Sequence, residues 1–247
     1  MKSAALALAM IMMAGNAVAG WYRVTNYVGQ IGASSVHVSI QRYDFGPGTT
    51  VLGSYYYDKH LSPIPVYGLE SDDKSLTLCE VHTPEEYEKA FVHGFKNGAY
   101  AIGCPLHLVP TDDGAVGEWR DSLHSYLVSL KRVGSLDTTK EVLISGVMEI
   151  PFWGQTEKHA FIGIYQASSL EVKVQVINKN TGMFIQTLAP KSDCGFGHYM
   201  TPIYMNLERS HFNPEEVYLN CWSPRYGQSA YYSFDKKTRK FRWSRDR

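Results

Sequence analysis

The chain has 247 residues, and its 24 Lys and Arg balance its 24 Asp and Glu, so the formal net charge is zero. A balanced charge argues against nucleic acid as a partner, because phosphate binding normally leaves a basic excess. The 17 Tyr, 21 Gly and 11 Pro, together with many Val and Ile, are typical of β structure.

Residues 1–19 have the features of a cleaved signal peptide. Lys2 supplies the positive start, residues 4–13 are apolar, and Ala17-Val18-Ala19 is the small-x-small pattern that a signal peptidase cuts. The apolar stretch is shorter than the roughly 20 residues that cross a bilayer, and no later segment is apolar for long enough. We therefore expect an exported protein, periplasmic or secreted, that has no membrane span.

Alternating apolar residues predict a series of strands in the first half of the mature chain. Val36, Val38 and Ile40 share one face of such a strand. Pro63 and Pro65 predict that one strand of a hairpin lies at a sheet edge, since proline donates no ladder hydrogen bond. The predicted strands of this half are 36–40, 54–57, 64–67, 76–81, 106–109, 117–119 and 126–130.

One short helix is predicted near 84–93, between these strands. Thr83 is a suitable N-cap, Pro84 suits the first helical position, and Glu86 completes a capping box. Gly94 would end this helix, and we expect residues 94–103 to return to strand.

A polar run at 134–140 lacks periodicity and is the predicted linker, so we divide the mature chain near residue 136. The loop at 178–182, which ends in Gly, predicts a hairpin in the second half. The predicted strands there are 142–150, 160–165, 172–177, 183–188, 230–234 and 239–243. The predicted fold is mostly β, with antiparallel sheets in an N-terminal β domain (20–136) and a C-terminal β domain (137–247), or in one large β domain.

The four cysteines are Cys79, Cys104, Cys194 and Cys221, an even number that favours disulfides in an exported chain. Three pairings are possible, and we favour Cys79–Cys104 and Cys194–Cys221, because each would tie neighbouring strands. A metal site is disfavoured, since no C-x-x-C occurs and the cysteines lack close His partners.

The sequence carries no G-x-S-x-G, and its cysteines are better used as disulfides than as nucleophiles. Two groups of possible metal ligands lack the spacing of a helical His pair, and we interpret them as loop and helix residues. They comprise His82, Glu85, Glu86 and His93, and then Asp193, His198 and His211. We therefore expect neither a metal nor a cofactor.

Two charged regions have simple structural explanations. Asp112, Asp113 and Glu118 suggest a glycosidase pair, but an Asp-Asp-Gly turn accounts for the first two. A basic cluster at the C-terminal end protects an edge strand from aggregation, although an anionic partner is the alternative. The cluster comprises Lys236, Lys237, Arg239, Lys240, Arg242, Arg245 and Arg247.

The loop at 193–199 is the candidate binding element, because two glycines flank an aromatic residue beside Cys194, a predicted disulfide. A tethered loop loses less entropy on binding, so it would suit insertion into a partner's cleft. A tight turn that buries its aromatic residue explains the pattern equally well. The predicted binding residues are Phe196, His198, Tyr199 and Arg225.

The order of motifs in the second half resembles a known group of proteins. A 174–188 hairpin with Asn180-Thr181-Gly182 at its turn precedes Thr201-Pro202-Ile203-Tyr204 and a closing Tyr-rich hairpin. This order resembles small all-β periplasmic proteins that include lysozyme inhibitors and immunity proteins against peptidoglycan-cutting toxins. The Asp/Asn-rich loop often found near the C-terminus of that group, a calcium site, is missing here, which puts a calcium role in doubt.

We therefore expect a non-enzymatic periplasmic binding protein that inhibits, or gives immunity to, a cell-wall hydrolase or a similar toxin. Its expected partner is that protein. One alternative is an exported glycan hydrolase that uses carboxylates such as Asp113 and Glu118. Another alternative is an envelope-associated structural module.

Overall fold

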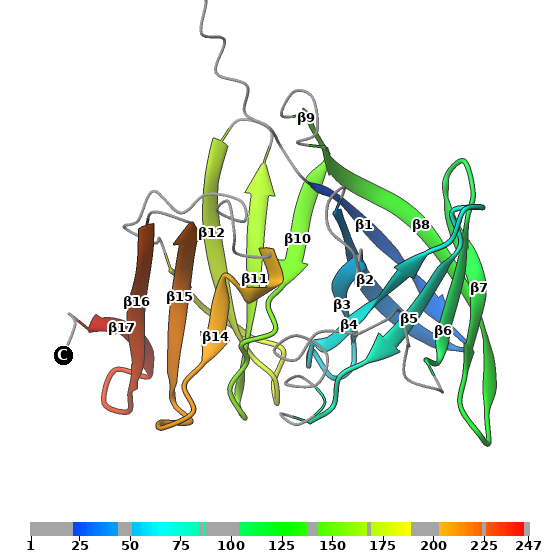
Figure 1. Cartoon of the computed structure of the whole chain (residues 1–247). Helices are drawn as coiled ribbons and strands as arrows, with labels where there is room; N and C mark the ends of the chain where they lie inside the picture. The colour runs from blue at the N-terminus through cyan, green and yellow to red at the C-terminus, as the bar shows by residue number, and fades with distance from the viewer. Residues whose placement is uncertain are drawn as a thin grey trace, which may run out of the picture.

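The structure is a computed structural model, and it describes residues 22–43, 51–83, 86, 104–137, 143–166, 169–188, 203–223 and 226–244. Within these ranges the regular elements are the strands β1 to β17 and one short 3-10 helix, η3 (Ile203–Met205). All strand pairings are antiparallel and make three sheets (Figure 1). The predicted fold class, mostly β with antiparallel sheets, is confirmed.

The first sheet closes on itself as a barrel. Its strands pair in chain order from β1 to β9, and β1 also pairs with β8, so the first eight strands form a ring (Figure 1). Closure removes the free edges that would otherwise invite pairing with another chain. The strands are β1 (Tyr22–Ile31), β2 (Ser34–Tyr43), β3 (Val51–Tyr57), β4 (Ile64–Glu70), β5 (Leu76–Glu80), β6 (Leu106–Pro110), β7 (Gly114–Arg120), β8 (Ser125–Asp137) and β9 (Leu143–Ser145).

Apolar side chains fill the barrel interior. Val36, Val38 and Ile40 on β2 are buried there together, which confirms the predicted alternation of that strand. An eight-stranded barrel is narrow enough for side chains to fill it. The interior cluster comprises Tyr27, Ile31, Val36, Val38, Ile40, Val51, Tyr55, Val66, Leu76, Leu78, Leu106, Leu108, Ala115, Val128 and Leu130.

The predicted hairpin of the first half is present as β3 and β4, but its predicted edge position is wrong. β4 pairs with β3 on one side and with β5 on the other. The prolines are tolerated because Pro63 precedes the strand and Pro65 lies near its start, where its carbonyl still accepts from Val81 N–H at 2.9 Å. The two prolines, which have no N–H to donate, therefore lie at the rim of the barrel, and the hydrogen bonds between the strands are kept.

The predicted linker at 134–140 is also wrong over its first half. Residues 134–137 belong to β8, which pairs with β1 across a register shift between Asn26 and Tyr27. Leu136 is buried, so this end of β8 is held by packing as well as by hydrogen bonds. The polar appearance arises because β8 is long and lies partly on the barrel surface. The division of the mature chain near residue 136 stays a prediction.

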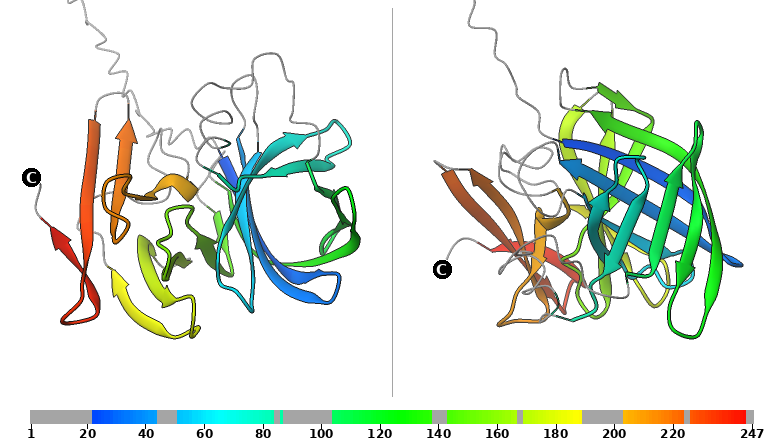
Figure 2. Two further views of the ribbon diagram at one scale, coloured as in Figure 1. Left: turned by 90° about the horizontal axis from the view of Figure 1, so that it is seen from below. Right: turned by 45° about the vertical axis from the view of Figure 1, so that its right-hand side comes forward.

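Two four-stranded sheets follow the barrel (Figure 2). The predicted hairpin around 178–182 joins β12 and β13, and Gly182 has the positive φ of 67° that its turn requires. The predicted C-terminal hairpin joins β16 and β17. The strands are β10 (Val147–Pro151), β11 (His159–Gln166), β12 (Ser169–Asn178), β13 (Phe184–Leu188), β14 (Leu207–Arg209), β15 (Glu216–Ser223), β16 (Tyr226–Asp235) and β17 (Lys240–Ser244).

A second apolar core joins the barrel wall to these two sheets. Val24, Leu52 and Leu136 on the outside of the barrel belong to the same cluster as Phe161 on β11 and Phe241 on β17. Part of the outer face of β1 to β3 is therefore buried, and over that part these strands are packed on both faces. The two smaller sheets thus cover one side of the barrel, and the candidate site lies beside this contact.

Buried polar side chains cross the same interface and form a polar seam. The Tyr204 hydroxyl donates to Ser39 Oγ at 2.8 Å, and Ser39 Oγ donates to Asn26 Oδ1 at 2.7 Å. Asn26 Nδ2 in turn donates to the Glu149 carbonyl. Each of these groups needs its partner, because an unpaired buried polar group is costly. The seam fixes one orientation between the barrel and the sheets.

Two local predictions near the barrel end are confirmed. Glu86 N–H donates to Thr83 Oγ1 at 3.2 Å, and Glu86 Oε2 accepts from Thr83 N–H at 3.2 Å, which is the predicted capping box. The Cys79–Cys104 disulfide is present. The signal peptide at 1–19, most of the helix at 84–93, the strand at 94–103 and the Cys194–Cys221 pairing lie outside the described residues.

Candidate functional site

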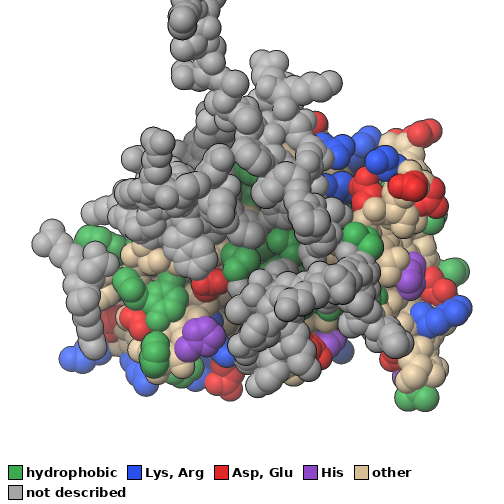
Figure 3. All heavy atoms as spheres, viewed as in Figure 1, with side chains coloured by type: hydrophobic (Ala, Val, Ile, Leu, Met, Phe, Trp, Pro, Cys, Tyr) green, Lys and Arg blue, Asp and Glu red, His purple; other side chains and the backbone are tan. Residues whose placement is uncertain are grey.

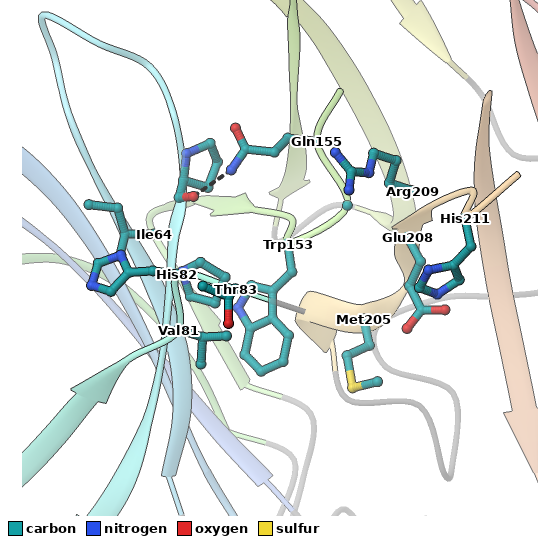
Figure 4. Close-up of a pocket in the computed structure, with 13 residues that line it drawn as sticks. Ile64, Val81, His82, Thr83, Trp153, Gln155, Met205, Glu208, Arg209 and His211 are labelled. Carbon is teal, nitrogen blue, oxygen red and sulfur yellow. Dashed lines mark hydrogen bonds between the residues drawn. The ribbon is translucent and has the colours of Figure 1, made fainter. Parts of the chain in front are cut away.

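A groove of about 680 Å³ lies where one end of the barrel meets the C-terminal sheets. Figure 4 shows Trp153 and Met205 in its middle, with His82 on the barrel side and Arg209 and His211 on the opposite side. The groove is lined by chain segments that are far apart in sequence: 63–65, 81–83, 153–155 and 205–211. It is the hollow in which described side chains of different chemistry converge.

Trp153 forms the apolar floor of the groove and is held on several sides. Its indole Nε1–H donates to the Gly53 carbonyl at 2.7 Å, and its ring stacks on Tyr204 with 6.2 Å between centroids. The next residue, Gly154, has to be glycine, because a Cβ at this position would lie 2.2 Å from the Leu207 carbonyl oxygen. Only glycine lets the segment that carries Trp153 approach β14 this closely, and the Gly154 N–H donates to the Leu207 carbonyl at 2.9 Å, which ties the floor to the C-terminal sheet.

On the barrel side, a buried carboxylate fixes the rim. Glu80 accepts hydrogen bonds from Trp119 Nε1 at 2.7 Å and from the Tyr55 hydroxyl at 2.5 Å. Burial and the adjacent Glu80 carboxylate raise the pKa of Tyr55, so its hydroxyl stays protonated and donates. His82 Nε2 lies 2.9 Å from the other Glu80 oxygen, which anchors an exposed imidazole at the groove.

On the opposite side, hydrogen bonds orient the polar rim. Gln155 Nε2 donates to the Pro63 carbonyl at 2.6 Å, and the Gln155 oxygen accepts from Lys179 Nζ at 2.9 Å. Asn220 Nδ2 donates to Glu208 Oε2 at 2.7 Å. Because these contacts span the barrel and both smaller sheets, the rim does not depend on one loop.

The exposed groups of the rim carry charge of both signs. Arg209 and His211 are exposed beside Glu208, and His82 is exposed across the groove. An apolar floor inside a polar, mixed-charge rim is the arrangement found in protein-binding surfaces. The groove can therefore bind an apolar side chain and pair the polar groups that flank it.

The predicted binding residues Phe196, His198, Tyr199 and Arg225 lie outside the described residues. His82 and His211, interpreted from the sequence as loop histidines, both line the groove. Trp153, Met205 and Arg209 were not predicted. The one sequence signal for the floor was an aromatic pair followed by glycine, 152–154, directly after a strand.

The candidate glycosidase carboxylates are not brought together. Asp112 and Asp113 occupy the β6–β7 turn, whereas Glu118 lies further along β7, about 16 Å from Asp113 at the rise of an extended strand. Glu118 accepts hydrogen bonds from Ser125 and Arg120, and these lower its pKa. A general acid requires a raised pKa, so this environment suits an ion pair better than proton donation.

The basic C-terminal hairpin lies at a sheet edge, as predicted, because β17 is the last strand of its sheet. The Gln186 side chain covers part of that edge, since it accepts from Phe241 N–H at 2.7 Å and donates to Phe241 O at 3.0 Å. Lys236 lies 3.5 Å from Glu215, and Arg242 lies 3.0 Å from Asp235. The edge position of the hairpin is confirmed, and the protection of that edge by these charges stays a prediction.

Comparison with family models, with curated proteins and with solved structures gives no match to this chain. Among the described residues, no helix has the length and apolar character needed to cross a membrane.

Proposed function

We propose that this protein is a non-enzymatic binding protein of the periplasm that inhibits, or gives immunity to, a cell-wall hydrolase or a similar toxin. The observation that carries the proposal is the groove, whose apolar Trp153 floor is enclosed by the exposed groups of His82, Arg209 and His211. The resemblance of the second half to inhibitor and immunity proteins supports the class of partner. The Cys79–Cys104 disulfide supports an oxidising compartment.

Rigidity favours binding over catalysis at this groove. Trp153 is fixed by a hydrogen bond and by ring stacking, and Gln155 by two hydrogen bonds, so little side-chain entropy is lost when a partner docks. Aromatic and Arg side chains are also the residue types that contribute most at protein interfaces. A protruding segment of the target, with an apolar residue at its tip, is the fitting occupant.

The test begins with capture of a target from a periplasmic extract by the immobilised mature protein, followed by a cell-wall lysis assay on any captured hydrolase. The protein is expected to suppress lysis at micromolar concentration. Arg209→Glu is expected to weaken binding about tenfold, because the reversed charge would oppose the group of the partner that pairs with Arg209.

Lys240→Glu is the matched control, since it reverses an exposed basic residue on β17 that is outside the groove. It should bind and inhibit like the original chain. If no hydrolase is captured or inhibited, the proposed function is wrong. Equal losses in Arg209→Glu and Lys240→Glu would show that the groove is not the binding site.

A further inference from the structure

A second hollow, of about 480 Å³, lies at the rim of the barrel and shares no lining residue with the groove. One wall is formed by Ala33, Ser34 and Ser35, at the turn after β1 and the start of β2. The other wall is formed by residues 57–60, at and after the end of β3. Barrel mouths are common places for small-molecule sites, and the volume lies within the range of such sites. The hollow is therefore a candidate site for a small ligand.

Aromatic side chains border the mouth of the barrel beside this hollow. Tyr57 and Trp119 pack against the interior cluster, so strand alternation directs both rings to the inside of the barrel end. Tyr126 pairs with Trp119 across the β7–β8 ladder, with 5.7 Å between their ring centroids. A Cβ at Gly32 would lie 3.1 Å from the Tyr126 ring. The turn that forms one wall of the hollow therefore rests on an aromatic residue of the mouth.

Tyr57 belongs both to the hollow and to the mouth. It lines the hollow, and its ring stands edge-on to Tyr55 with 5.6 Å between centroids. Burial raises the pKa of Tyr57, a hydrogen bond with Tyr55 counteracts this rise, and the nearby Glu80 and Tyr126 add to it. The Tyr57 hydroxyl is therefore protonated and able to donate. Its half-buried ring also offers an aromatic face to a ligand.

Hydrogen bonds order both walls of the hollow. Asp58 N–H donates to the Ser35 carbonyl at 3.1 Å, which joins the two walls. The Asp58 carboxylate lies 3.3 Å from His37 Nε2, on β2. On the far side of the turn, His60 N–H donates to the Tyr57 carbonyl at 2.8 Å. These contacts form within the chain, so little ordering is needed when a ligand binds.

The mixture of polar groups indicates the class of ligand. Asp58 disfavours an anion and Lys59 disfavours a cation, so the hollow does not select an ion of either sign. On the barrel face that Figure 3 shows, acidic and basic side chains likewise lie next to one another. The hydroxyls of Ser34 and Ser35 can both donate and accept. A neutral ligand with several hydroxyls can satisfy all these groups together, and its C–H groups are attracted to the negative face of an aromatic ring.

We propose that this hollow at the barrel mouth is a saccharide-binding site. A sugar ring stacks on Tyr57, and its hydroxyls bond to Ser34 and Asp58. Because two turns enclose the hollow, it takes the end or a short segment of a neutral glycan. The site shares no lining residue with the groove, so its ligand is independent of the protein partner proposed there.

The test is isothermal titration calorimetry of the mature protein with three neutral saccharides: chitotetraose, cellotetraose and maltotetraose. At least one of them is expected to bind saturably at millimolar concentration. Tryptophan fluorescence should change on binding, because Trp119 lies at the mouth beside Tyr126. Inorganic phosphate and choline are the charged comparison ligands, and neither should bind.

Two variants locate the site. Tyr57→Ala should weaken binding about tenfold, because it removes the stacking face. Ser34→Trp should abolish binding, because it fills the hollow from an exposed position and leaves the buried residues unchanged. Tyr231→Ala is the matched control, since Tyr231 is also half-buried and edge-on to a second tyrosine, Tyr218, but lies on β16 outside the hollow. It should bind like the original chain.

Arg209→Glu separates this site from the groove, because it should bind the saccharide like the original chain. Circular dichroism checks that each variant is folded, and Ser34→Trp decides the outcome if Tyr57→Ala is not. The proposal is wrong if none of the three saccharides binds, or if phosphate or choline binds in their place. Saccharide binding that Ser34→Trp leaves unchanged, or that Tyr57→Ala and Tyr231→Ala weaken equally, also overturns it.

Discussion

The hydrogen bonds of the polar seam, between the barrel and the C-terminal sheets, allow a quantitative prediction of stability. Ser39→Ala removes the acceptor of the Tyr204 hydroxyl and the donor to Asn26 Oδ1, and these groups lie in a dry interface, with Ser39 and Tyr204 fully buried. A buried polar group that has lost its hydrogen-bond partner costs about 1 to 3 kcal/mol. We therefore expect Ser39→Ala to lower the free energy of unfolding by about 2.5 kcal/mol. Tyr204→Phe leaves Ser39 bonded to Asn26 and should cost about 1 kcal/mol.

The double variant separates this explanation from simple loss of packing. When the Tyr204 hydroxyl is absent, Ser39→Ala leaves one fewer buried polar group without a hydrogen-bond partner. The double variant should therefore be more stable than Ser39→Ala alone by about 1 kcal/mol. Urea unfolding gives the free energies, and each kcal/mol should shift the Tm by about 2 to 4 °C for a chain of this size.

Ser122→Ala is the control, because Ser122 is exposed in the β7–β8 turn and its loss should fall within about 0.5 kcal/mol. Two results would refute the reasoning. One is a Ser39→Ala variant no less stable than Tyr204→Phe. The other is a double variant whose loss equals the sum of the two single losses.

Three further predictions concern ionisation and covalent links. Hydrogen bonds from Lys74 and Arg42 outweigh the effect of burial and lower the pKa of Glu70. The Glu70 carboxylate therefore stabilises the fold above about pH 4.5, and this stabilisation is lost as the pH falls through the folded-state pKa. Arg42→Met should therefore cost about 2 kcal/mol at neutral pH, discounted for partial exposure, and less in acid unfolding experiments. Cys104→Ser should lower the free energy of unfolding by about 3 kcal/mol in non-reducing buffer, measured by urea denaturation, because the open loop gains entropy in the unfolded chain. Burial, with Lys158 nearby, lowers the pKa of His159 below 6.5, so NMR titration should find it there, and stability from this group should fall as the pH drops below 6.5. A His159 midpoint at or above 6.5 would contradict its buried position.

The confirmed predictions rest on local sequence patterns. Val36, Val38 and Ile40 alternate because only one side of β2 needs continuous apolar contact inside the barrel. The 178–182 hairpin follows from turn chemistry, since Asn178 Oδ1 accepts the N–H of Asn180 and Gly182 takes a positive φ. The capping box of Thr83 and Glu86 is likewise formed within four residues. Each of these signals is complete within a short stretch of chain.

Barrel closure could not be predicted in this way. β1 was not among the predicted strands, because Val24, Asn26 and Tyr27 are buried on both of its faces and alternation is lost there. Val24 packs outward against the C-terminal sheets, Tyr27 packs inward, and Asn26 is a buried polar residue of the seam. The pairing that closes the barrel joins β1 to β8, roughly a hundred residues away, and such long-range pairing leaves no local signal.

The groove shows why function was harder to predict than fold. Its floor and rim come from four segments that the barrel and the seam bring together, and none of them is a motif by itself. Trp153 resembles an ordinary core residue until Gly154 allows β14 to approach it. His82 and His211 look like unrelated loop histidines until the fold places them on one groove. A binding surface needs complementary shape rather than a fixed spacing of reactive groups, so its residues become recognisable only once the chain is folded.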